Sequence, residues 1–166
     1  MRNISTLCGV RSQLSQAILD SLAMAWSRLD RARPPRTTGV PGLLSALDEW
    51  VRWAMRVDDE LTEAVGASYA TRRAEQPGGM QLTGLRHVHH LTQDLGHPIE
   101  ALVTVSAGSP AIFYDVAWRP FEDLPPPSVV TGGEAAYRQH LAGRPARMPA
   151  SNVTTFLLSI AVEDDD

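Results

Sequence analysis

Four of the five histidines in this chain lie in one short stretch, residues 82–98, LTGLRHVHHLTQDLGHP. If the stretch is helical, successive residues turn by about 100°, so His87, His90 and Asp94 follow one another along one stripe. Two imidazoles and one carboxylate are a ligand set that catalytic zinc and non-haem iron sites use. The spacing therefore predicts a candidate divalent-metal site. The plainer interpretation, a polar helix face whose histidines titrate near neutral pH, needs no cofactor, and no established motif such as HExxH is present.

A second chemistry is general acid–base catalysis by His90, with Arg86 four residues before it. An imidazole that moves a proton and a guanidinium that holds a phosphate are the minimum for metal-independent cleavage of RNA. Asp58 joins this candidate site because it falls within the apolar face of the preceding helix. A buried carboxylate needs a partner, and we predict that Asp58 finds it on the facing helix among Arg86, His87, His90 and Asp94. Asp58 could also supply a fourth oxygen to the metal site or orient one of the histidines.

A separate candidate binding surface lies on the same long helix. Arg52 and Arg56 are spaced i, i+4, and Trp53 lies beside them, off the main apolar stripe. This arrangement predicts a contact surface for nucleic acid or for a protein interface. An ordinary solvated helix face is the alternative.

Hydrophobic periodicity and breaker residues divide the chain into helices followed by a small amount of β-structure. Residues 76–79, QPGG, are expected to interrupt the helices, Gly66 to weaken or bend the long one, and Ser151 to cap the last segment. That segment, residues 151–162, fits a helix or a strand. The predicted helices are 12–31, 43–73, 80–95 and 133–141, and the predicted hairpin pairs 101–107 with 112–118.

These elements predict a mainly α (α+β) protein: an antiparallel bundle of three long helices, a small β-hairpin and one or two short C-terminal helices. Residues 1–98 form the bundle, and residues 99–166 pack on it within one domain. Two strands alone are marginal in water, so the hairpin is expected to pack on the helices or to pair with another chain.

The composition indicates the cellular compartment and limits the classes of partner that are expected. The net charge of −4 argues against a general nucleic-acid coat but leaves room for a local basic patch. Cys8 is the only cysteine, which excludes an internal disulfide and a cysteine-based zinc site and fits a reducing compartment. No signal-peptide core and no run of about 18–20 apolar residues is present, so a cytoplasmic protein that does not span a membrane is expected.

Three segments carry a family resemblance: LDEW with VDDEL in the long helix, WRPFEDLPPP after the hairpin, and GEAAYRQHLAGRP near the end. In these the chain resembles a set of short, uncharacterised actinobacterial open reading frames. Their third helix looks like the motif of HEPN nucleases, α-helical domains with an Arg and a His separated by four to six residues. The resemblance implies an HEPN-like fold, with Asp58 or Asp59 matching a polar residue of the earlier helix.

The chain departs from the HEPN pattern where catalysis would depend on it. Three residues separate Arg86 from His90, and His87 stands where the motif has Asn. The shortened spacing favours an HEPN-like interaction or nucleic-acid-related module without regular nuclease activity. Two alternatives stay open: a metal-independent RNase that uses His90 and Arg86, and a metal-binding helical protein that uses His87, His90 and Asp94. The expected partners are a second copy of the chain, another protein, or RNA.

Overall fold

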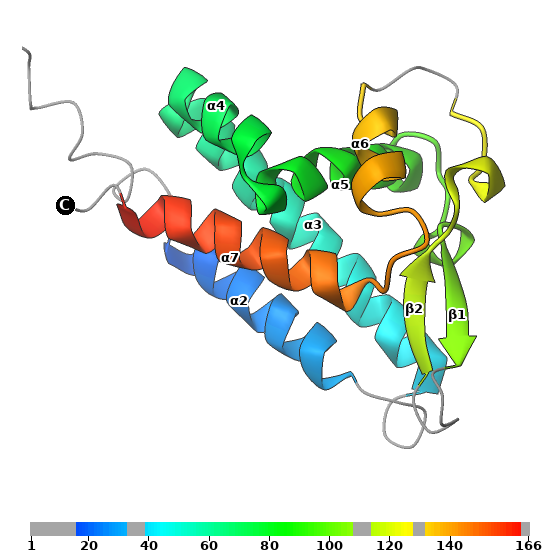
Figure 1. Cartoon of the computed structure of the whole chain (residues 1–166). Helices are drawn as coiled ribbons and strands as arrows, with labels where there is room; N and C mark the ends of the chain where they lie inside the picture. Colours follow the sequence, from blue (N-terminus) through cyan, green and yellow to red (C-terminus); the bar gives the residue numbers. More distant parts are fainter. Residues whose placement is uncertain (1–15, 33–38, 108–113, 128–131, 164–166) are drawn as a thin grey trace, which may run out of the picture.

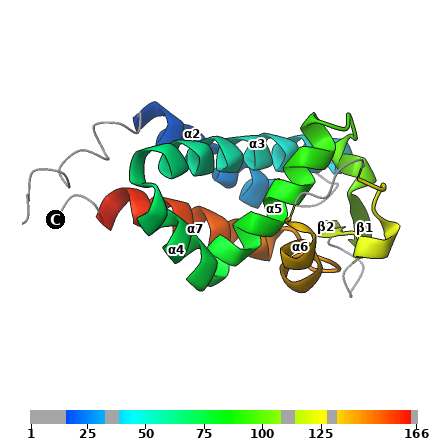
Figure 2. The ribbon, with the colours of Figure 1, turned by 90° about the horizontal axis from the view of Figure 1, so that it is seen from above.

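The computed structural model describes residues 16–32, 39–107, 114–127 and 132–163. Three long helices lie side by side: α2 (Gln16–Arg31), α3 (Gly39–Val65) and α7 (Arg147–Glu163), with α2 running opposite to the other two (Figure 1). Two further helices, α4 (Ala67–Glu75) and α5 (Pro77–Gln93), follow α3, and α5 runs obliquely to the long helices (Figure 2). The short helix α6 (Glu134–His140) packs on α5.

A two-stranded antiparallel sheet lies at one end of the bundle (Figure 1). Strand β1 (Val103–Ala107) pairs with β2 (Tyr114–Trp118), and Val105 lies opposite Val116. Short 3-10 turns flank the hairpin, η2 (Ile99–Ala101) before it and η3 (Phe121–Asp123) after it. The predicted fold class, mainly α with a small hairpin, is confirmed.

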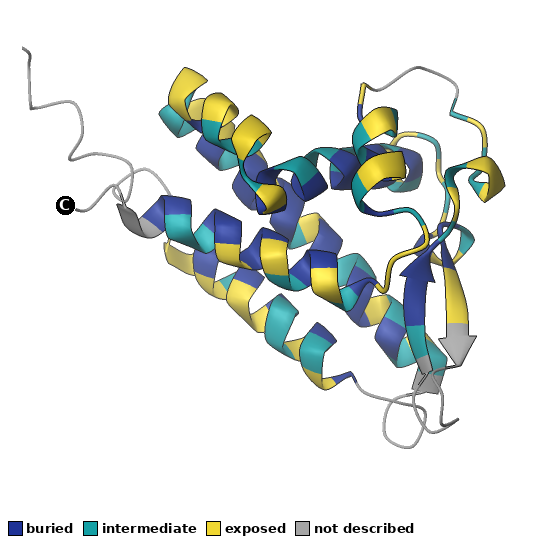
Figure 3. Cartoon of the chain, in the orientation of Figure 1, coloured by how far each residue is buried: buried dark blue, intermediate teal, exposed yellow. Residues whose placement is uncertain are grey.

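The core fills the space between the long helices, α5 and the inner face of the hairpin (Figure 3). Trp50 of α3 and Trp118 of β2 are both fully buried. The Trp50 indole Nε1–H donates to the Thr154 hydroxyl of α7 at 3.0 Å, which satisfies the polar atoms of both residues inside the core. The 82–98 stretch packs into the core through Leu85, Val88 and Leu91, which are fully buried, and Leu95 after the end of α5 is partly buried.

The prediction of one helix over 43–73 is wrong, because two helices, α3 and α4, cover this range, and their arrangement positions the site. Gly66 has φ 65°, a left-handed conformation that favours glycine, and the chain there ends α3 and starts α4. The expected bend at this glycine is thus a full break between two helices. The reversal returns α4 along α3, which brings residues far apart on a straight helix close together.

Two other predicted boundaries need correction. The predicted interruption at residues 76–79 is present between α4 and α5, but it is limited to Gln76, whose backbone is extended. Pro77 already occupies the first turn of α5, where its missing N–H costs no hydrogen bond, so this helix begins three residues earlier than predicted. The segment 151–162 is helical and belongs to α7, which begins at Arg147, so Ser151 is not its N-cap. The predicted start of the first helix and of the second strand, 12–15 and 112–113, lies outside the described residues.

None of the helices in the described ranges combines the length and the apolar character needed to cross a membrane.

Candidate functional site

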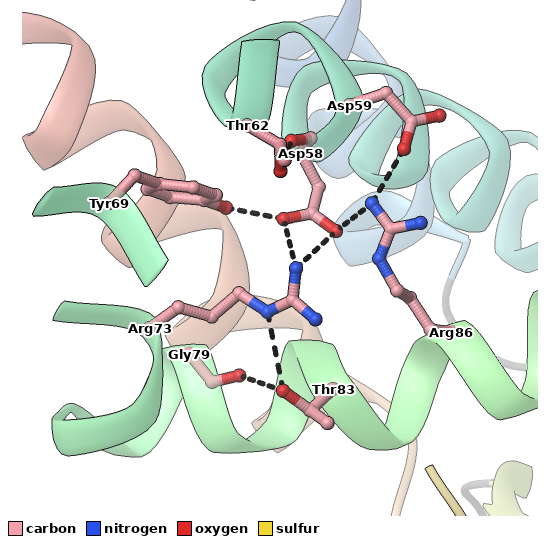
Figure 4. Close-up of polar contacts among 8 residues, drawn as sticks. All are labelled: Asp58, Asp59, Thr62, Tyr69, Arg73, Gly79, Thr83 and Arg86. Atoms are coloured by element: carbon pink, nitrogen blue, oxygen red, sulfur yellow. Dashed lines mark hydrogen bonds and ion pairs between the residues drawn. The ribbon is translucent and has the colours of Figure 1, made fainter. Parts of the chain in front are cut away.

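Asp58 of α3 is the centre of a polar cluster that joins three helices. Its side chain is fully buried. The Tyr69 hydroxyl of α4 donates to Oδ1 at 2.6 Å, and Arg73 Nη1 of α4 donates to Oδ1 and Oδ2 at 3.1 and 3.2 Å. Arg86 Nη2 of α5 lies 2.5 Å from Oδ2 (Figure 4). The predicted approach of Arg86 to Asp58 is therefore present, and Tyr69 and Arg73 add to it.

The local sequence explains why these side chains converge. The turn at Gly66 reverses the chain, and the i, i+4 spacing of Tyr69 and Arg73 places both on the side of α4 that faces Asp58. Gly79 lets α5 approach α4, because a Cβ there would lie 2.3 Å from the Arg73 carbonyl oxygen. Two glycines thus determine where the network forms.

The cluster balances its charges, with two guanidiniums against the carboxylates of Asp58 and Asp59. Burial lowers the pKa of Arg86, but the attraction of Asp58 and the bond to Asp59 outweigh it, and the pKa rises above its ordinary value. Burial, with the charge of Asp58 next, raises the pKa of Tyr69, so its hydroxyl remains a donor at neutral pH. Both of these donors therefore keep the proton that the network requires.

The second partner of Arg86 is exposed. Arg86 Nη2 donates to Asp59 Oδ1 at 2.5 Å, and the Asp59 side chain is 59% exposed. On the other side, Arg73 Nε donates to the Thr83 hydroxyl at 3.3 Å, and that hydroxyl donates to the Gly79 carbonyl at 3.2 Å (Figure 4). The network therefore runs from the buried carboxylate to the surface at Asp59.

The two residues of the predicted acid–base pair are each engaged with a carboxylate. Arg86 contacts Asp58 and Asp59, whereas His90 Nδ1 lies 2.5 Å from Oδ2 of Asp94, the C-cap residue of α5. A guanidinium held by two carboxylates is neutralised toward an incoming phosphate. The Asp94 contact fixes the His90 ring through Nδ1, an arrangement that also occurs where a histidine acts as a base.

His87 lies in a different environment from His90 and Asp94. It is buried beneath η3 and α6, stacked on Phe121 with ring centroids 5.9 Å apart and edge-on to Tyr137 at 5.7 Å. Burial lowers the pKa of His87, with His90 acting in the same direction and Glu134 against it. Across the described part of the chain, no group of three or more His, Cys, Asp or Glu side chains is placed to hold a metal ion. The structure does not assemble the predicted ligands His87, His90 and Asp94.

The predicted binding residues on α3 do come together. Arg52, Trp53 and Arg56 line one hollow of about 610 Å³, together with Ser45 and Glu49. Trp53 is partly buried and packs against the hydrophobic core. The hollow is open to solvent, and its lining combines an aromatic ring with two cations.

Both arginines of this hollow already have acidic partners on the same helix. Arg52 Nη2 lies 2.8 Å from Asp48 Oδ2, and Arg56 Nη2 lies 2.6 Å from Glu60 Oε1. The arginine side chains are 57% and 61% exposed. Exposed i, i+4 pairs of this kind contribute only about 0.3–0.5 kcal/mol, so either arginine can exchange its partner for a ligand anion at little cost.

Comparison of the chain with protein-family models, with curated proteins and with solved structures finds no match. The function is therefore inferred from the residues of this chain and from their geometry.

Sequence reasoning identified Asp58 and Arg86 but missed Tyr69 and Arg73. The signal for the missing residues was present: a carboxylate on an apolar stripe requires donors, and Tyr69 and Arg73 share one helical face. A straight helix over 43–73 would place both residues beyond the reach of Asp58.

Proposed function

We propose that the protein is a helical module that binds single-stranded RNA through α3, without regular nuclease activity. The observation that carries the proposal is the hollow that Arg52, Trp53 and Arg56 line together. The resemblance to HEPN domains points to the same class of ligand. Arg86, the arginine that the resemblance would make catalytic, is instead paired with Asp58 and Asp59.

The chemistry of the hollow fits an unpaired nucleic-acid strand. Proteins that bind single strands combine aromatic side chains, on which bases stack, with cations that follow the phosphates. Arg52 and Arg56 lie one helical turn apart on the outer side of α3 and stay exposed while paired to carboxylates. A duplex offers no unstacked base to Trp53, so single-stranded RNA is the preferred form.

Fluorescence anisotropy with labelled single-stranded RNAs of unrelated sequence tests this function. We expect wild-type protein to bind them at low salt and Trp53→Ala to bind about 10- to 100-fold more weakly, because a lost base–aromatic stack is worth about 1–3 kcal/mol. Trp53→Phe is the matched control, and it should retain most of the affinity. Wild-type protein that binds no RNA, or Trp53→Ala that binds as well as wild type, would overturn the proposal.

A metal-independent RNase remains the second candidate, because the Asp94 contact at Nδ1 fixes the orientation of the His90 ring. The other ring nitrogen, Nε2, is buried, so a substrate would reach it only after a local rearrangement. A cleavage assay on total RNA with wild type and His90→Ala separates the two functions. We expect both proteins to leave the RNA intact. Cleavage by the wild type that disappears in His90→Ala would establish the enzyme instead.

A further inference from the structure

The two edges of the β-hairpin differ in how far the rest of the chain covers them. The outer edge of β2 is occupied by the segment after α6: Trp118 N–H donates to the Arg144 carbonyl at 3.0 Å, and Gly143 N–H donates to the Trp118 carbonyl at 2.8 Å. Ala146 N–H donates to the Val116 carbonyl at 2.8 Å. Backbone groups on this edge are therefore satisfied within the chain.

The same bonds determine the direction of the backbone groups on β1. Val116 and Trp118 point their N–H and C=O groups away from β1, so the residues opposite them, Val105 and Val103, point theirs away from β2. The Val103 carbonyl accepts a bond from Arg119 Nε at 3.0 Å. Val105 has no backbone partner on this side among the residues that the structure describes. Val105 is 44% exposed, and β1 is the strand on the outer side of the hairpin (Figures 1 and 3).

We propose that β1 pairs antiparallel with β1 of a second copy of this chain. A two-fold axis at Val105 makes the edge complementary to itself, because Val105 N–H of each copy meets the Val105 carbonyl of the other. The strand sequence VTVSA contains no charged residue and no proline, so no like-charge repulsion opposes the pairing. The product is a four-stranded sheet in the order β2–β1–β1–β2.

The second copy fits better than an unrelated extended peptide for two reasons. The same symmetry that satisfies the edge also places the two exposed Val105 side chains against each other and removes both from water. Pairing with a second copy also extends the sheet to four strands and places both β1 strands in its interior, away from the edges. The contact is short, because Arg119 already occupies the Val103 carbonyl at one end of β1. It is small beside the roughly 800 Å² per partner of a standard interface, so the dimer should dissociate on dilution.

The test is the solution mass measured by sedimentation or light scattering from micromolar to millimolar protein, in the absence of RNA. We expect the wild type to move from monomer to dimer, and Val105→Pro to stay monomeric with unchanged helical circular dichroism. Proline at this position removes the outward N–H and leaves the bonds between β1 and β2 in place. Val105→Thr keeps the N–H and the branched side chain and should still dimerise.

Two further readouts separate this dimer from other outcomes. Val105→Lys, which changes only an exposed side chain, places two like charges opposite each other and should also abolish the dimer even if the proline variant does not fold. Hydrogen exchange at the Val105 amide should slow as protein concentration rises. A monomeric wild type, or a dimer that persists in Val105→Lys with no change in that exchange, would overturn the proposal. Because no RNA is present, neither result depends on the proposed RNA binding.

Discussion

Helix α3 carries arginine–carboxylate contacts of two kinds. Asp58 lies on its inner face, fully buried, with Arg73 and Arg86 as partners from two other helices. On the outer face, Arg52 and Arg56 pair with acidic residues one turn away on α3 itself, and both are more than half exposed. The contact distances are similar, but the surroundings are opposite.

This difference decides what each arginine can do. A fully buried carboxylate must keep its partners, since removing a partner leaves an uncompensated charge in a medium of low polarity. A pair in water loses little when it opens. The inner contacts therefore hold α3, α4 and α5 together, and the outer arginines are available to a ligand.

Replacing the buried carboxylate should have the largest effect on folding. Asp58→Ala leaves Arg73 and Arg86 without their shared partner, and we expect the free energy of unfolding to fall by about 3–5 kcal/mol. Urea denaturation followed by circular dichroism measures it. Asp59→Ala, which removes the exposed partner of Arg86, is the matched control and should cost less than about 1 kcal/mol. Equal losses in the two variants would remove the distinction between the inner and outer contacts.

Tyr69→Phe should have a smaller effect in the same direction. The variant deletes the hydroxyl that donates to Asp58 and leaves both arginines in place, so we expect a loss of about 2 kcal/mol. Tyr137→Phe is a comparison from outside the network, because the Tyr137 hydroxyl donates to a neutral acceptor, the Arg119 carbonyl, at 2.6 Å. It should cost about 1 kcal/mol. A larger loss in Tyr137→Phe would show that the Asp58 network contributes less than proposed.

Stability should also decrease in acid because of His87. Its pKa is lowered mainly by burial, so the unfolded chain, whose histidines titrate near about 6.5, takes up the proton first. The contribution of neutral His87 is complete above about pH 6.5 and is lost as the pH falls below that value. Unfolding curves measured from pH 8 to pH 5 should show a steeper loss for wild type than for His87→Phe. Parallel pH profiles would contradict the burial of His87.

The sequence predicted the apolar stripes, the hairpin and the burial of Asp58, because periodicity and propensity are local properties. It indicated a weak point at Gly66 but not the reversal there, since a single glycine within a helical pattern is usually tolerated. The different surroundings of His87 and His90 could likewise not be predicted from the sequence. Helix spacing places both on one stripe, but the packing of Phe121 and Tyr137 over His87, which comes from distant segments, gives the two histidines different surroundings.

Of the candidate site residues, those on one helix were the most predictable. Arg52, Trp53 and Arg56 line one hollow because their spacing alone brings them together. Arg73 was missed because its approach to Asp58 depends on the reversal of α4 and on the close contact at Gly79.

The most direct test of the separation between inner and outer arginines is the double variant Arg52→Ala/Arg56→Ala. Its unfolding free energy and its RNA affinity are both measured. We predict an unfolding free energy within about 1 kcal/mol of wild type, as expected for two exposed pairs, together with a clear loss of RNA affinity. The slope of log affinity against log salt should shrink by about 0.7 for each phosphate that the variant no longer neutralises. Arg144→Ala, an exposed arginine away from α3, should bind RNA as wild type does. An unchanged RNA affinity and salt slope, or a loss of stability as large as that of Asp58→Ala, would contradict this separation.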